Sequence, residues 1–118
     1  STEDTSMTTL YKTRNEAKRA CIREAEWATA FARKAIRHAE NGEVTKAWGA
    51  TDNATCAAKC AMKAHDELWE LAHEKLTEDE FKAFCAAEEA FNEANRAARL
   101  SAEAGQKAQA EFDAKRRS

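Results

Sequence analysis

The residues best suited to chemistry in this 118-residue chain are its four cysteines, Cys21, Cys56, Cys60 and Cys85. Cys56 and Cys60 lie four residues apart, so on one helix their thiolates would share a face and could bind a soft metal such as copper or zinc. A structural alternative makes Cys21 a small core residue and the other three free thiols of an intracellular protein. A disulfide is geometrically reasonable only between Cys21 and Cys60, and it would suit an extracellular helical rod.

Histidine adds a further candidate ligand. His65 lies on an apolar helical row, level with Cys21 and Cys60, although a histidine in such a row is more often a half-buried side chain with one hydrogen bond. Glu70 and His73 form an ExxH pair, which di-iron bundles use in duplicate, but the sequence has no second pair. Glycine-rich phosphate loops and GxSxG motifs are also absent from the sequence. We therefore expect a protein without a cofactor and without enzymatic activity.

Alanine supplies 28 of the 118 residues, and the alanines recur at spacings of three and four. The chain contains no proline and only three glycines, a composition typical of long helices. A seam of small side chains lets helix backbones approach closely. The clearest row is Ala47, Ala50, Ala54, Ala57, Ala61, Ala64, Leu68 and Leu71.

Two breaks divide the helical pattern. Asn41 and Gly42 tolerate the left-handed conformation that closes a helix, and Thr77 with Glu80 forms a capping box that begins another. Short connections make consecutive helices antiparallel. The sequence therefore predicts an all-α, up-down-up antiparallel three-helix bundle of coiled-coil-like helices in one domain, residues 7–118, after a flexible segment, residues 1–6. The predicted helices cover about 7–40, 44–75 and 78–115.

Folding the chain at these breaks predicts which side chains share a level of the core. Large residues should meet small ones, or one another, in buried layers. One small and partly polar layer should separate them. The predicted layers are Ile36, Trp48 and Gly105; Ile22, Met62 and Phe91; Trp69 and Phe84; and the polar layer Thr29, Thr55 and Ala98.

The first predicted helix carries most of the candidate binding residues. Trp27 sits one position off the alanine seam and could anchor an interface, and basic residues follow the same helix. Glutamates interleave with them and the net charge of the chain is only −2, so nucleic-acid binding through this helix is a weaker expectation. The candidate partner-binding residues are Trp27, Arg19, Arg23, Arg33 and Arg37.

Two alanine-lined flanks should also accept another helix. One is the side of the first helix that bears Cys21 and Ala25, and the other runs along the third helix. We therefore expect a protein partner or self-association through helix faces. The third-helix flank consists of Ala86, Ala90, Ala97, Leu100 and Ala104.

These observations favour a non-enzymatic helical interaction protein: an adaptor, inhibitor or assembly module of the kind that phages or mobile elements encode. A soft-metal or redox-responsive thiol protein using Cys21, Cys56, Cys60 and His65 is the alternative, and an extracellular helical protein with a disulfide is a second. The sequence given has no signal-peptide pattern and no apolar run of transmembrane length. We expect a cytoplasmic protein that does not bind membranes.

Overall fold

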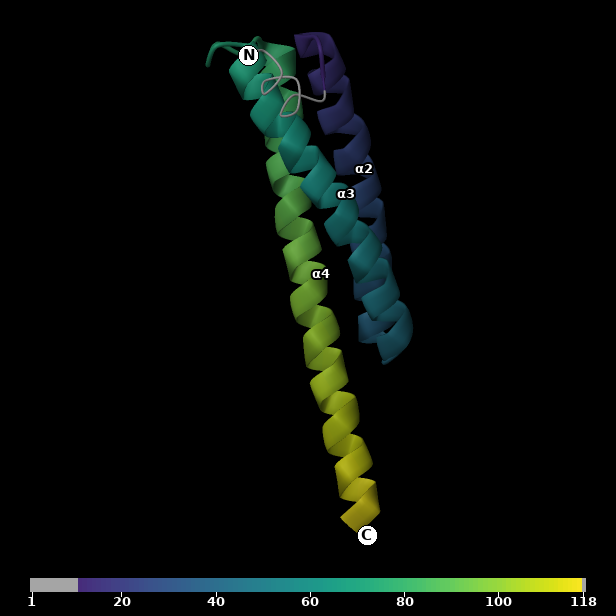
Figure 1. The fold of residues 1–118 in the computed structure, drawn as a ribbon. Coiled ribbons are helices and arrows are strands. Elements are labelled where there is room, and N and C mark those ends of the chain that lie inside the picture. Colours follow the sequence, from purple (N-terminus) through teal and green to yellow (C-terminus); the bar gives the residue numbers. More distant parts are fainter. Residues whose placement is uncertain (1–10, 118) are drawn as a thin grey trace, which may run out of the picture.

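The computed structural model describes residues 11–117, which form three helices: α2 (Arg14–Glu40), α3 (Val44–Leu71) and α4 (Glu78–Arg117). The helices run up, down and up, and each packs against the other two (Figure 1). This confirms the predicted all-α three-helix bundle. The 40 residues of α4 make it longer than the α2–α3 hairpin, so its C-terminal part extends past the turn between α2 and α3 (Figure 1). The predicted flexible segment, residues 1–6, lies outside the described residues.

Helix α2 begins later than the sequence pattern predicts. Residues 11–13 are not helical, and residues 7–10 lie outside the described part of the chain. Thr13 caps the helix: its hydroxyl accepts a hydrogen bond from the Glu16 backbone N–H at 3.1 Å, and the Glu16 carboxylate accepts from the Thr13 N–H at 3.3 Å. This capping box satisfies backbone donors at the first turn, so the predicted start near residue 7 is wrong.

Helix α3 ends at Leu71, four residues before the predicted end. His73 and Glu74 adopt left-handed backbone conformations, with φ of 52° and 66°. Such conformations cannot continue a right-handed helix and cost about 1 kcal/mol or more for residues other than glycine. The turn is held by the Arg14 guanidinium, whose Nη2 donates to the Lys75 carbonyl at 2.9 Å.

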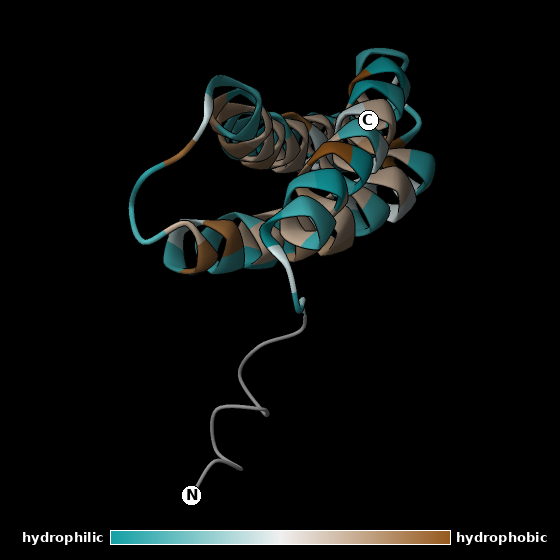
Figure 2. Cartoon of the chain, turned by 90° about the horizontal axis from the view of Figure 1, so that it is seen from above, coloured by the Kyte–Doolittle hydropathy of each residue, from teal (hydrophilic) through white to brown (hydrophobic). Residues whose placement is uncertain are grey.

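The core consists mainly of alanine. Most residues of the predicted α3 row are buried, including Ala47, Ala54, Ala61 and Ala64, which have no exposed surface. Leu68 is the largest fully buried side chain, and Figure 2, which looks down the bundle, shows the three helices around one shared interior. Small side chains therefore set the separation of the helices.

Because the helices lie so close, the large side chains do not form most of the predicted buried layers. Trp48 and Ile22 are 39% and 40% exposed, and Phe91 is also exposed. The side chain nearest to Gly105 belongs to Val44, where a Cβ on the glycine would lie 3.7 Å from Cγ1. The layers built on Trp48 with Gly105 and on Ile22 with Phe91 are therefore wrong.

Of the other two predicted layers, one is confirmed and one is wrong. The predicted meeting of Trp69 and Phe84 is confirmed, with ring centroids 5.6 Å apart. The buried polar contact lies elsewhere than predicted, between the hydroxyls of Thr51 and Ser101 at 3.0 Å. Thr29, Thr55 and Ala98 are instead partly exposed. An alanine seam leaves room for short hydroxyls between α3 and α4, whereas the large rings lie along the outside of the bundle.

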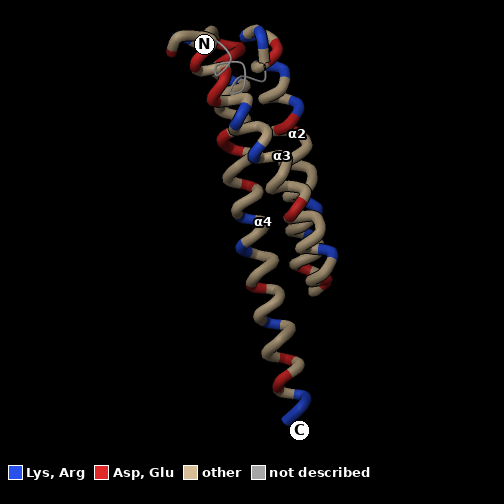
Figure 3. The backbone as a smooth tube through the Cα atoms, in the orientation of Figure 1, with Lys and Arg blue, Asp and Glu red and all other residues tan. Residues whose placement is uncertain are grey.

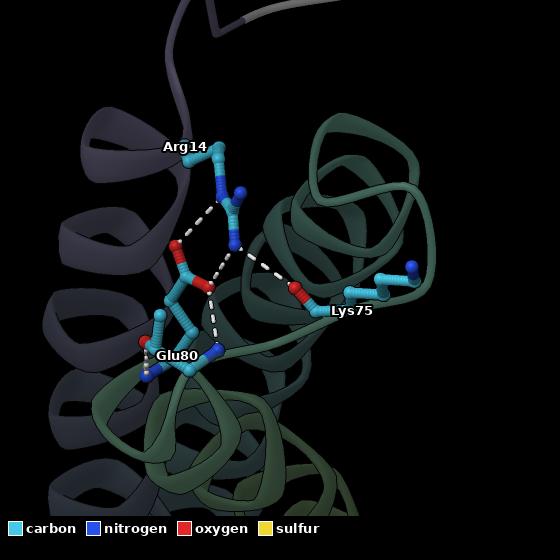
Figure 4. Close-up of polar contacts among 4 residues, drawn as sticks. Arg14, Lys75 and Glu80 are labelled. Carbon is cyan, nitrogen blue, oxygen red and sulfur yellow. Dashed lines mark hydrogen bonds and ion pairs between the residues drawn. The ribbon is translucent and has the colours of Figure 1, made fainter.

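An ion pair ties the start of α2 to the start of α4 (Figure 4). Arg14 donates from Nε and Nη2 to the two carboxylate oxygens of Glu80 at 2.9 and 2.6 Å. Glu80 also completes the predicted capping box, because its carboxylate accepts from the Thr77 N–H at 2.9 Å and its own N–H donates to the Thr77 hydroxyl at 3.2 Å. The pair fixes how α2 and α4 are aligned along the bundle.

Among residues 11–117, no helix combines the length and apolar character needed to span a membrane.

We predict that Glu80→Gln lowers the free energy of unfolding at pH 7 by roughly 1–2 kcal/mol, because the uncharged amide loses the charge-assisted bonds to Arg14. Arg14 is 41% exposed, so water screens the pair and keeps the loss in this modest range. Hydrogen bonding from Arg14 lowers the pKa of Glu80 from 4.5 to about 2. A lowered carboxyl pKa stabilises the folded state above the unfolded value, so the wild-type advantage should decline from pH 4.5 to 2.

Urea unfolding at several pH values measures this difference. Glu78→Gln, an exposed change in the same helical turn, is the matched control and should have little effect. An equal loss in both variants, or a loss that does not depend on pH, would contradict the role of the Arg14 pair.

Candidate functional site

The four cysteines are free thiols and lie in different surroundings. Cys21 is completely buried in α2, and this burial raises the pKa of its thiol to about 11. Cys56 and Cys60 are exposed on α3, and Cys85 is partly exposed on α4. The structure therefore does not gather the candidate thiols at one solvent-accessible point.

His65 is held by carboxylates and an aromatic ring. Its Nδ1 lies 2.8 Å from an oxygen of Asp66, its Nε2 lies 2.9 Å from an oxygen of Glu88, and Phe84 stacks on the ring at 3.6 Å between centroids. Both ring nitrogens are thus engaged in hydrogen bonds, which leaves neither lone pair directed at a metal. Within residues 11–117, no three His, Cys, Asp or Glu side chains are arranged to hold a metal ion.

The ExxH pair is not a helical pair in the structure. Glu70 lies in the last turn of α3, whereas His73 follows the end of the helix in a left-handed conformation. The two side chains therefore lack the helical spacing that metal-binding bundles use.

The candidate partner-binding residues separate onto different faces. Arg19 and Arg23 line a hollow beside Tyr11 near the start of α2. Trp27 is 57% exposed and stacks on Phe31, with centroids 5.7 Å apart. Arg33 and Arg37 line a third region, a groove between α2 and α4. The five residues do not make one surface.

The groove between α2 and α4 has a volume of about 1100 Å³, more than the hollows beside Tyr11, Phe31 and Trp69. Half of its lining is small or apolar, including Ala25 and Ala86 from the two flanks that the sequence indicated as helix acceptors. Ile22, which the sequence placed in the core, is exposed here. The apolar and small lining residues are Ile22, Ala25, Thr29, Ala30, Ile36 and Ala86.

Other parts of the predicted flanks are closed by the bundle itself. Cys21, Ala90 and Ala97 are buried between the helices, and Leu100 packs partly against the same core. Ala104 is partly exposed beyond the groove. Only Ala25 and Ala86 of these flanks therefore line the groove.

The charged half of the lining has an ordered pattern. On each helix the glutamates come first in the chain and the arginines follow. In Figure 3 the tube of α4 changes from red to blue near its label, in agreement with this order. The sequence pattern indicated Arg33 and Arg37 as binding candidates. It did not indicate the α4 residues, because the sequence does not show how α4 is aligned beside α2. The charged residues are Glu26, Arg33 and Arg37 from α2 and Glu89, Glu93 and Arg96 from α4.

Most of these charges have no ion-pair partner within residues 11–117. Glu93 and Arg96 approach each other at 3.9 Å, a weak contact on an exposed helix face. Glu26, Arg33, Arg37 and Glu89 make no ion pair with another described residue. The groove thus presents an apolar strip flanked by available charges of both signs.

No protein-family model, curated protein or solved structure matches the chain.

We predict a graded order of thiol reactivity in the native protein. Cys56 and Cys60 should react rapidly with a thiol reagent because they are exposed, and Cys85 more slowly. Cys21 should react only after unfolding, because burial excludes the reagent and its raised pKa leaves little thiolate at neutral pH. Mass spectrometry of the labelled peptides measures the order. Rapid labelling of Cys21 in the native protein would contradict the closed α2–α3–α4 core.

Proposed function

We propose that the protein is a non-enzymatic interaction protein, an assembly or adaptor module, that holds a helix of a macromolecular partner in the α2–α4 groove. The observation that supports this most strongly is the lining of the groove, an apolar strip of small residues between charged side chains. Protein interfaces combine an apolar centre with a polar rim, and amphipathic helices bind in grooves of this kind.

The dimensions of the groove favour a helix. On α2 the lining extends from Ile22 to Arg37, about 22 Å at 1.5 Å per residue, or four helical turns. Alanine and threonine let the backbone of an incoming helix approach closely, as they do inside the bundle. A partner helix would then complete a fourth side of the bundle and cover Ile22.

The charges of the groove favour a protein over a nucleic acid. A nucleic-acid backbone needs a surface of one sign, whereas Glu26, Glu89 and Glu93 share the groove with the arginines. The other two arginines that the sequence indicated as binding candidates, Arg19 and Arg23, line a separate hollow.

The thiol alternative receives less support. Carboxylates hold both ring nitrogens of His65, and Cys21 lies in the core, away from the exposed Cys56 and Cys60. The groove therefore remains the best-supported site of action.

Site-specific photo-crosslinking in the cells that make the protein tests this proposal. A crosslinking amino acid in place of Ala30, inside the groove, should capture a partner through a helical peptide, whereas one in place of Lys34, on the α2–α3 side, should not. The purified captured protein should bind the wild type and should bind Ile22→Glu at least about tenfold more weakly, because a carboxylate would lie on the apolar strip. Equal capture from both positions, or none from position 30, would contradict the proposal.

A further inference from the structure

We propose that the partner in the groove is a second copy of this chain, docked antiparallel, groove to groove, about a twofold axis that passes near Thr29. This inference rests on the proposed function of the groove and names its occupant: helices α2 and α4 of a second copy, rather than one isolated helix, cover the groove. The charges along α2 and α4 carry it.

The Arg14–Glu80 pair provides the alignment of the two helices. Helices α2 and α4 run in the same direction, and the pair joins residues 66 positions apart in the chain. Each residue of α2 therefore lies about level with the residue of α4 that is 66 positions further on. By this alignment, Glu26 and Glu93 differ in level by about one residue. Arg33 and Arg96 differ by about three residues, which is less than one helical turn.

The acidic residues therefore occupy one end of the groove and the basic residues the other. Glu26, Glu89 and Glu93 lie toward the start of α2, and the three groove arginines lie toward its end. A groove with this polarity repels a parallel copy of itself, because α2 of one copy would then face α4 of the other and bring like charges together. It attracts an antiparallel copy.

The antiparallel twofold arrangement pairs four of the six groove charges. In a groove-to-groove dimer of this symmetry, α2 faces the partner's α2 and α4 faces the partner's α4, each in the opposite direction. Glu26 then lies opposite the partner's Arg33, with the axis midway between positions 26 and 33. Glu93 likewise lies opposite the partner's Arg96, and the midpoint of this second pair is level with the same part of α2.

The two helices thus indicate one axis independently, and it falls close to Thr29. Ile22, which is 40% exposed, supplies the apolar side chain nearest to the groove surface, seven positions before Thr29. Each copy would bury its Ile22 against the partner at the level of Ile36, which its own core already covers. Thr29 is small enough to let the two α2 helices cross closely at the axis.

The size of the groove limits how tightly two copies can bind each other. An interface about 22 Å long and two helices wide is smaller than a standard protein–protein interface, so we expect a weak, reversible dimer. Ile22 and each charge pair occur twice in a twofold dimer, which gives the interface its specificity for the antiparallel direction.

Charge reversal with the purified protein tests the inference. The pair Arg33→Glu/Arg96→Glu makes the groove acidic, and Glu26→Arg/Glu93→Arg makes it basic. Each variant alone should dimerise more weakly by roughly tenfold or more, because like charges face each other. A mixture of the two should restore dimers. Lys34→Glu/Lys59→Glu makes the same charge change on exposed residues outside the groove and should leave dimerisation unchanged.

Analytical ultracentrifugation over a range of concentrations measures how strongly each variant, and the mixture of the two, dimerises. Circular dichroism verifies that each variant is folded. Dimers that are weakened in each reversed variant by itself and restored in the mixture of the two support the antiparallel dimer. Unimpaired dimers of either reversed variant, or failure of the mixture to associate, would overturn it.

A disulfide placed at the predicted axis gives a second test that changes no charge. Thr29→Cys in a Cys56→Ser/Cys60→Ser/Cys85→Ser background should form a covalent dimer on mild oxidation, whereas Lys34→Cys in the same background should not. Equal crosslinking of both would overturn the inference. A wild-type protein that stays monomeric at millimolar concentration would also overturn it, yet the proposed function would stand if position 30 still captured a different protein in cells.

Discussion

The small size of the side chains between the helices is the constraint on which the rest of the structure depends. Alanine occupies nearly every inward position of α2, α3 and α4, so the backbones lie close and no space remains for an indole or a phenyl ring. The large apolar side chains must then lie along the outer edges of the helix pairs, where Ile22, Trp48 and Phe91 are exposed. Close helix packing inside thus produces apolar surface outside.

This constraint connects the fold with the groove. A narrow core gives a bundle whose α2–α4 face is lined by alanine, threonine and isoleucine rather than filled by large side chains. The Arg14–Glu80 pair holds the two helices in one alignment, which places carboxylates at one end of the groove and guanidiniums at the other. A helix face of opposite polarity could bury the apolar strip and satisfy both ends, and the proposed antiparallel copy would supply one.

Local signals in the sequence were sufficient to predict three helices and the two breaks between them, but not the start of α2 or the end of α3. The breaks at Asn41–Gly42 and Thr77–Glu80 are confirmed, because turn and cap residues act within a few positions of the chain. The contacts between helices were harder to predict from the sequence, because heptad spacing indicates which face of a helix is buried but not how far apart the helix axes lie. That distance decides whether Trp48 enters the core. Predicting the groove would have required the alignment of α2 with α4, which depends on the pair of Arg14 and Glu80, 66 residues apart in the chain.

The free energy of unfolding of Ala54→Leu is the most direct measurement of whether alanine sets the helix separation. Ala54 has no exposed surface, so a leucine there must force the helices apart. The account predicts a loss of about 1–3 kcal/mol in urea unfolding relative to wild type, as for other overpacked cores. Ala110→Leu, the same change at an exposed position of α4, should have almost no effect. A more stable Ala54→Leu variant would show unfilled space between the helices and would contradict the account.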